Sequence, residues 1–327
     1  MTADFATTWI NLAQPRLGAE MVAASDDFFA AKERLIGPGA PVFIPDKYDA
    51  HGKWMDGWES RRKRGPGHDW AILRLGQAGI VHGVEIDTRH FTGNYPAAAS
   101  LDACADEARL PGSEASWTPL VPATALEGDR QHFLAVDDAR AWTHLRLNIY
   151  PDGGVARLRV YGRFALSLAP GTRIDLAALE HGGRPIACND AHFGVPENLL
   201  APGRGVNMGD GWETRRRRAP GYDWAILALG QVGTIDEILI DTLHFKGNYP
   251  DRCFLQAALA PNLPDQALIA QAQFWPLLLP EQKLEANREH RFTAEVAALG
   301  PVSHVRFNIV PDGGVSRLRL YGTVAPA

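Results

Sequence analysis

The sequence predicts an all-β protein made of two tandem antiparallel β-sandwich domains. Three observations lead to this prediction. The chain repeats itself once, short apolar runs alternate with polar residues at a period of two, and long helical periodicity is scarce. A chain of 327 residues is long enough for two domains of ordinary size, each with its own core.

The repeat consists of three motifs that occur twice in the same order. The first two return 154 residues later (56 to 210), and the third returns 160 residues later (148 to 308). The pairs are DGWESRR at 56–62 with DGWETRR at 210–216, DTRHFTGNYP at 87–96 with DTLHFKGNYP at 241–250, and NIYPDGGV at 148–155 with NIVPDGGV at 308–315.

The changes in spacing between the copies locate insertions. The first half carries ten extra residues between Ile36 and Asp56 (19 against 9), and the second half is six residues longer between Pro250 and Asn308. Such changes in length are tolerated in loops. The join falls near the APG segment at 169–171, so we predict domains over residues 1–169 and 170–327.

Alternating residues predict strands over 69–73, 84–87, 145–149 and 158–160, each with one buried face. The turn sequence PDGG at 151–154 predicts a hairpin between the last two. A few helical turns are predicted at 28–35 and 284–291. This order of strands resembles the galactose-binding-like jelly roll, a fold whose ligand sites lie in loops at one end of the sandwich.

The loop at 56–62 is the first candidate site. Glu59 stands beside Arg61 and Arg62, and a guanidinium binds a carboxylate through two hydrogen bonds, which suits an anionic substrate. The alternative is that Glu59 forms ion pairs with these arginines while Trp58 fills a core, because ion-pair networks often resemble sites.

The loop after the strand at 84–87 is the second candidate. His90 is a natural proton shuttle near neutral pH, and Asn94 can bind a urea-like amide as both donor and acceptor. The alternative is that Asn94 supports a turn beside Gly93 and that His90 caps strand ends. Repetition of the polar residues in the second half favours function: they recur as Glu213, Arg215, Arg216, His244 and Asn248.

Composition excludes several function classes. A net charge of −5 gives no general attraction to nucleic acid or anionic membranes, and no apolar stretch is long enough for a membrane helix. Three cysteines without a CxxC pair, and a first segment without the pattern of a secretory signal, predict a cytoplasmic protein. No metal-binding spacing of the HxH or HExxH kind occurs, so we expect neither metal nor cofactor.

The two doubled loops, each followed by Asp-Trp, resemble the allantoicase family, and so do the NLA motif at 11–13 and the ASDDFFA motif at 24–30. The similarity covers nearly the whole chain. It implies tandem jelly-roll domains, a role in purine (allantoin) breakdown, and hydrolysis of allantoate to ureidoglycolate and urea. It also implies a homo-oligomer with a small-molecule substrate.

The chemistry of this reaction suggests roles for the candidate residues. Allantoate carries a carboxylate and two ureido groups on one tetrahedral carbon, so the enzyme needs a carboxylate ligand, an acid for the departing urea nitrogen and a base for water. The carboxylate ligands would come from Arg61 and Arg62 or from Arg215 and Arg216. The predicted catalytic residues are Glu59, His90, Glu213 and His244, and Asn94 or Asn248 would bind a ureido group.

Two other interpretations remain. One is a non-enzymatic, galactose-binding-like protein that only binds a ligand. The other is a structural tandem sandwich in which the repeated loops serve only as scaffold. The residues do not decide whether one repeat or both hold a site.

Overall fold

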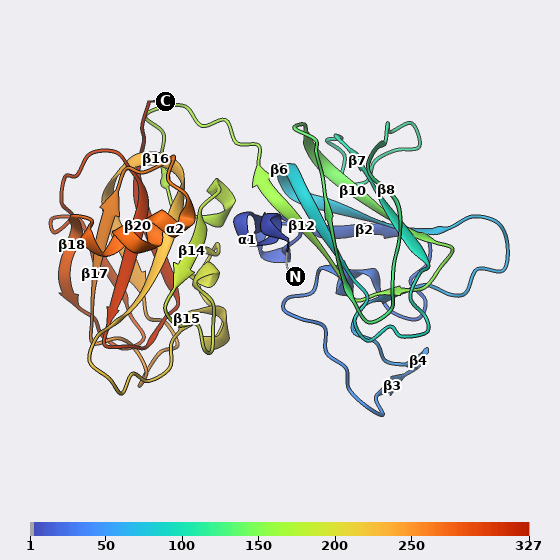
Figure 1. Ribbon diagram of the computed structural model, residues 1–327, viewed down its shortest axis with the longest axis horizontal. Coiled ribbons are helices and arrows are strands. Elements are labelled where there is room, and N and C mark those ends of the chain that lie inside the picture. Colours follow the sequence, from blue (N-terminus) through green and yellow to red (C-terminus); the bar gives the residue numbers. More distant parts are fainter. Residues whose placement is uncertain (1–2, 327) are drawn as a thin grey trace. The chain divides into compact units, whose positions relative to one another are not determined.

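The computed structural model describes residues 3–326, and its chain divides into two units, Met1–Ala165 and Leu166–Ala327 (Figure 1). In both units most of the regular secondary structure is strand, and the strands of the large sheets pair antiparallel. The predicted all-β class with two tandem sandwiches is therefore confirmed.

The first unit has three short helices and twelve strands among its described residues. They are α1 (Asp4–Thr8), β1 (Ile10–Asn11), η1 (Pro15–Leu17), β2 (Glu20–Ala24), η2 (Lys32–Ile36), β3 (Tyr48–Asp49), β4 (Gly52–Lys53), β5 (Trp58–Glu59), β6 (Asp69–Asp87), β7 (Ala98–Cys104), β8 (Thr118–Ala125), β9 (Gln131–Ala135), β10 (Ala141–Tyr150), β11 (Gly154–Val155) and β12 (Arg157–Phe164).

The second unit repeats this order with small changes. Its elements are β13 (Arg173–Asp175), η3 (Leu179–His181), β14 (Arg184–Cys188), η4 (Pro196–Leu200), η5 (Met208–Asp210), β15 (Trp212–Glu213), β16 (Asp223–Asp241), β17 (Arg252–Ala258), α2 (Asp265–Gln271), η6 (Ala272–Phe274), β18 (Leu277–Lys283), β19 (Glu289–Phe292), β20 (Val302–Val310), β21 (Gly314–Val315) and β22 (Arg317–Val324).

One 19-residue strand, β6, belongs to both layers of the first sandwich. Its first part pairs with β2 and β10, and its last part pairs with β9 and β12. The sequence predicted two separate strands here. The strand continues through Gly76. A side chain is excluded at this position because a Cβ would lie 1.8 Å from the Leu17 carbonyl oxygen, so only glycine allows this close approach.

The predicted hairpin at 151–154 is wrong. β10 and β12 pair with successive parts of β6 and not with each other, while β11 pairs with β5. The turn residues have another use: a Cβ on Gly154 would lie 2.0 Å from the Phe91 ring. Gly154 therefore leaves room for the Phe91 ring in the core.

The helix predictions fail in part. The predicted segment 28–35 is helical only at η2 (Lys32–Ile36), and 284–291 contains a turn followed by β19. The apolar residues of 284–291 fit a strand end as well as a helix face. The two α-helices, α1 and α2, were not predicted. No helix within residues 3–326 is long and apolar enough to cross a membrane.

The tryptophan of each doubled loop is a core residue. Trp58 and Trp212 are fully buried, and each indole N–H donates to a backbone carbonyl, that of Asp26 at 2.8 Å and that of Asp190 at 2.9 Å. This burial fixes β5 and β15, and it places the next residue, Glu59 or Glu213, at the end of the sandwich where the loops gather.

Candidate functional site

A cavity of about 490 Å³ lies among the loops of the first unit. The ten-residue insertion forms much of its wall, and the two candidate loops supply most of the rest. The lining residues are Phe29, Phe43, His51, Gly52, Lys53, Met55, Glu59, His90, Thr92, Asn94 and Asp129. The structure thus brings together Glu59, His90 and Asn94, three of the predicted site residues.

Glu59 and Asn94 are hydrogen-bonded to each other in this cavity. The Asn94 side-chain N–H donates to Oε1 of Glu59 over 2.7 Å. Burial raises the pKa of the Glu59 carboxyl above its ordinary value, and the Asn94 hydrogen bond opposes that rise by stabilising the anion. Glu59 is therefore biased toward its protonated form, which suits an acid catalyst.

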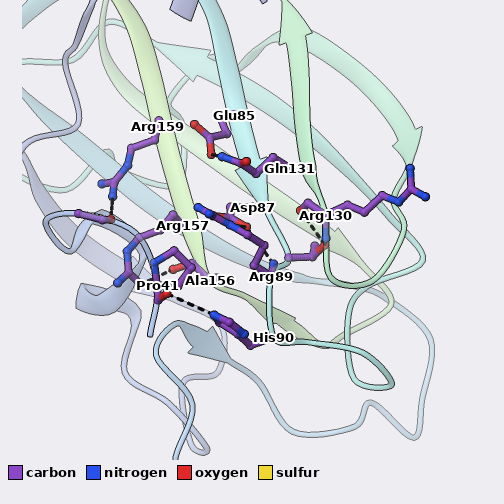
Figure 2. Close-up of polar contacts among 12 residues, drawn as sticks. Pro41, Glu85, Asp87, Arg89, His90, Arg130, Gln131, Ala156, Arg157 and Arg159 are labelled. Atoms are coloured by element: carbon purple, nitrogen blue, oxygen red, sulfur yellow. Dashed lines mark hydrogen bonds and ion pairs between the residues drawn. The ribbon is translucent and has the colours of Figure 1, made fainter. Parts of the chain in front are cut away.

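His90 is held at both its backbone and its ring. The residue has a φ of 71°, and its backbone N–H donates to Oδ1 of Asp129 over 2.9 Å. Its Nε2 lies 3.2 Å from the Pro41 carbonyl, a contact visible in Figure 2. A carbonyl only accepts, so Nε2 carries the proton and Nδ1 holds the lone pair of the neutral ring.

Two arginines of β12, Arg157 and Arg159 (labelled in Figure 2), bind the start and the end of the insertion. Arg159 donates to the carbonyls of Gly37 and Gly39, at 2.7 and 2.5 Å. Arg157 forms an ion pair with Asp56 at 2.6 Å and is almost fully buried. The insertion is therefore attached firmly to the sheet at both ends, while its middle reaches over the cavity.

Arg61 and Arg62 do not line this cavity. Arg61 forms an ion pair with Asp26, with Nη2 and Oδ2 2.7 Å apart, and its side chain is 63% exposed. Arg62 is exposed. The second unit repeats this arrangement, since Arg215 pairs with Asp190 at 3.1 Å and Arg216 is exposed.

The second unit keeps the contacts between its polar residues. Asn248 donates to Oε1 of Glu213 over 2.5 Å, and Nε2 of His244 lies 2.8 Å from the Gly205 carbonyl. His244 also has a positive φ, 73°, and its N–H donates to Oδ1 of Asn287 over 2.8 Å.

The wall formed by the insertion is what the second unit lacks. The segment that joins η4 to Asp210 is ten residues shorter than its counterpart in the first unit, and it has no phenylalanine, histidine or lysine to match Phe43, His51 and Lys53. In their place the sulfur of Met208 lies 3.9 Å from the Asn248 side-chain nitrogen.

Lys53, Phe43 and Asp129 were missed by the sequence reasoning. Lys53 and Phe43 lie in the insertion, which has no second copy and so gives no repeat signal. Asp129 does have a signal that was overlooked: the segment EGDRQH at 127–132 recurs as EANREH at 285–290, 158 residues later (129 to 287).

Comparisons with known proteins agree on one family. A family model described as the allantoicase repeat matches the chain twice, over residues 10–165 and 174–325. The sequence is 58% identical to "Probable allantoicase 1" of Burkholderia mallei, over 98% of this chain and 96% of that protein. It is 57% identical to "Probable allantoicase" of Pseudomonas paraeruginosa, over 98% of each.

A solved structure is similar over the whole fold. The crystal structure of allantoicase from Saccharomyces cerevisiae superposes with a TM-score of 0.82 at 35% sequence identity, covering 97% of this chain and 94% of that chain. The similarity in sequence and in structure therefore extends through both units.

Proposed function

The chain belongs to the allantoicase family, and we propose that the cavity of its first unit is where allantoate is hydrolysed to ureidoglycolate and urea. The protein is a hydrolase of C–N bonds in linear amidines, with a small-molecule substrate. A protein that only binds a ligand is not favoured. The observation that carries the choice of site is the meeting of Glu59, His90 and Asn94 in one cavity.

The reaction exchanges one bond at a tetrahedral carbon. The bond from this carbon to a ureido nitrogen breaks, that nitrogen takes a proton and leaves as urea, and the oxygen of water bonds to the carbon and loses a proton. The site therefore needs a proton donor near the departing nitrogen and a proton acceptor near the water.

Glu59 is our proposed proton donor. Its burial raises the pKa of the carboxyl and so favours the form that carries a proton. His90 is the proposed acceptor, because Nε2 is already engaged by Pro41 and Nδ1 is left with the lone pair. Asn94 has a second N–H and an amide oxygen with which to bind a ureido group.

The copies in the second unit serve as scaffold in this proposal. Glu213 and Asn248 keep their hydrogen bond, and His244 keeps its contact with a loop carbonyl, but the second unit lacks the wall formed by the insertion. The predicted roles of Arg61, Arg62, Arg215 and Arg216 as carboxylate ligands stay predictions. The ion pairs of Arg61 and Arg215 with aspartates already use part of their binding capacity.

We also propose a cytoplasmic homo-oligomer. The three cysteines, Cys104, Cys188 and Cys253, are free thiols, which suits a reducing compartment. Light scattering on the purified chain measures the assembly state, and a monomer at micromolar concentration would contradict this part of the proposal.

The activity is tested by product analysis. The purified protein should release urea and ureidoglycolate from allantoate, with no ammonia formed directly. Ammonia as the first nitrogen product would indicate an amidohydrolase, and binding of allantoate without turnover would favour a ligand-binding protein.

A further inference from the structure

We infer that Lys53, in the insertion of the first unit, binds the carboxylate of the substrate and so selects anionic ureido compounds. This inference rests on the proposed function, since it assumes that allantoate occupies the cavity beside Glu59 and His90.

Binding of an anionic substrate in this cavity requires a cationic group. Glu59 and Asp129 both line it, and an anionic substrate placed near them is repelled wherever they are ionised. Of the eleven lining residues, Lys53 is the one with an ammonium or guanidinium group. A single ammonium group among these lining residues gives the substrate carboxylate a defined position.

Lys53 is free of competing carboxylates. Its Nζ lies 4.6 Å from the centre of the Phe43 ring, and within residues 3–326 no carboxylate forms an ion pair with it. Arg61, by contrast, is already paired with Asp26. A cation–π contact at an exposed site is worth little compared with a charged hydrogen bond, so the ammonium can bind an incoming anion.

Phe43 links Lys53 to the proposed base. The ring that carries the ammonium also stacks on His90, with centroids 5.8 Å apart and planes inclined by 27°. Lys53 itself ends the β3–β4 hairpin, where it pairs with Tyr48. The hairpin therefore places a cation next to the reacting end of the cavity, and the second unit has no equivalent residue.

The test compares Lys53→Met with wild type on two substrates, allantoate and its neutral carboxamide analogue, which keeps both ureido groups. Loss of a charged hydrogen bond should lower kcat/KM for allantoate about tenfold to a hundredfold, mainly through KM. With the carboxamide the two proteins should differ by no more than about twofold. Lys53→Arg, which keeps the charge, should restore part of the activity on allantoate.

Lys47→Met is the matched control. Lys47 lies in the same insertion, but its Nζ rests on the Trp54 ring at 3.6 Å and it does not line the cavity. Its kinetics on allantoate should remain those of wild type. Circular dichroism and the Tm of each variant report whether the fold is retained.

A further variant separates this inference from the proposed function. Glu59→Gln should lose turnover but still bind allantoate in calorimetry, and adding Lys53→Met should weaken that binding. An active Glu59→Gln protein overturns the proposed site. If Glu59→Gln is inactive but Lys53→Met has the kinetics of wild type, the inference for Lys53 is wrong while the proposed site stands. If Arg62→Met instead shows the selective loss on allantoate, the substrate carboxylate is bound by Arg62 and the inference for Lys53 is wrong.

Discussion

The backbone N–H of His90 donates to the carboxylate of Asp129 over 2.9 Å, and both residues have a positive φ, 71° and 57°. Such values are uncommon outside glycine and need support from the surroundings. In the second unit, His244 and Asn287 repeat the arrangement with φ values of 73° and 53°. In both units the side chain at this position accepts the hydrogen bond through an oxygen atom. It is a carboxylate in Asp129 and a neutral amide in Asn287.

This relationship predicts different effects of two substitutions at Asp129. Asp129→Asn copies the second unit, so it should keep kcat within about twofold of wild type. Asp129→Ala removes the acceptor, frees the His90 backbone and should lower kcat about tenfold or more. Steady-state kinetics on allantoate measure both. Equal damage from Asn and Ala would mean that the charge of Asp129 matters and that its role is not merely to position His90.

The two units should differ in their need for the glutamate. Glu59→Gln keeps the shape of the side chain but cannot donate a catalytic proton, so kcat should fall at least about a hundredfold. Glu213→Gln is the matched control and should remain close to wild type, because the proposed chemistry occurs in the first unit. Comparable losses in both variants would show that the second unit also contributes to catalysis.

Asn94→Leu should shift the pH profile. The Asn94 N–H stabilises the anion of Glu59, so its removal raises the pKa of that carboxyl further. Glu59 then stays protonated to higher pH. The alkaline fall of kcat/KM should move upward relative to wild type, besides any overall loss from weaker ureido binding. A profile that moves to lower pH, or does not move, is evidence against Glu59 as the acid.

Replacing the middle of the insertion tests its role as a wall. Residues 38–54 can be exchanged for the shorter segment 202–208. Arg319 binds the carbonyls of Gly203, inside that segment, and of Ala201, just before it, much as Arg159 binds those of Gly39 and Gly37. The chimera should fold, with the circular dichroism of wild type, and lose kcat/KM about a hundredfold or more. Full activity in a folded chimera would place the site elsewhere.

Acid should weaken the protein through His304. Burial lowers the pKa of this histidine from 6.5 to about 4, with Arg184 adding to the decrease and Asp265 opposing it. The unfolded chain therefore binds a proton that the folded chain does not, and stability falls as the pH drops from about 6.5 toward 4.

The full size of this effect is about 3 kcal/mol. His304→Gln should flatten the decline in urea-unfolding free energy between pH 7 and pH 5, whereas the exposed His192→Gln should not. An unchanged pH dependence in His304→Gln would assign the decline to other groups, such as the fully buried His144.

The sequence was most informative where the chain repeats itself. Glu59, His90 and Asn94 stood out because each has a copy in the second half, and the structure brings all three to one cavity. Lys53 has no copy, so comparing the halves could not find it. The continuity of β6 was not predicted, because glycine is unfavourable inside a strand and Gly76 therefore looks like a break. Its role in the structure is a close approach to Leu17, which is distant in sequence.

The arginine anchors on β12 and β22 have a consequence for how such a protein can diverge. Loop closure becomes only slowly more costly with length, so a segment tied to the sheet at its base can gain residues with little loss of stability. After the duplication, one copy could therefore acquire a hairpin with new side chains while the other stayed short. A library randomised over 42–53 should yield many folded variants, and those variants are where altered substrate preference should be sought.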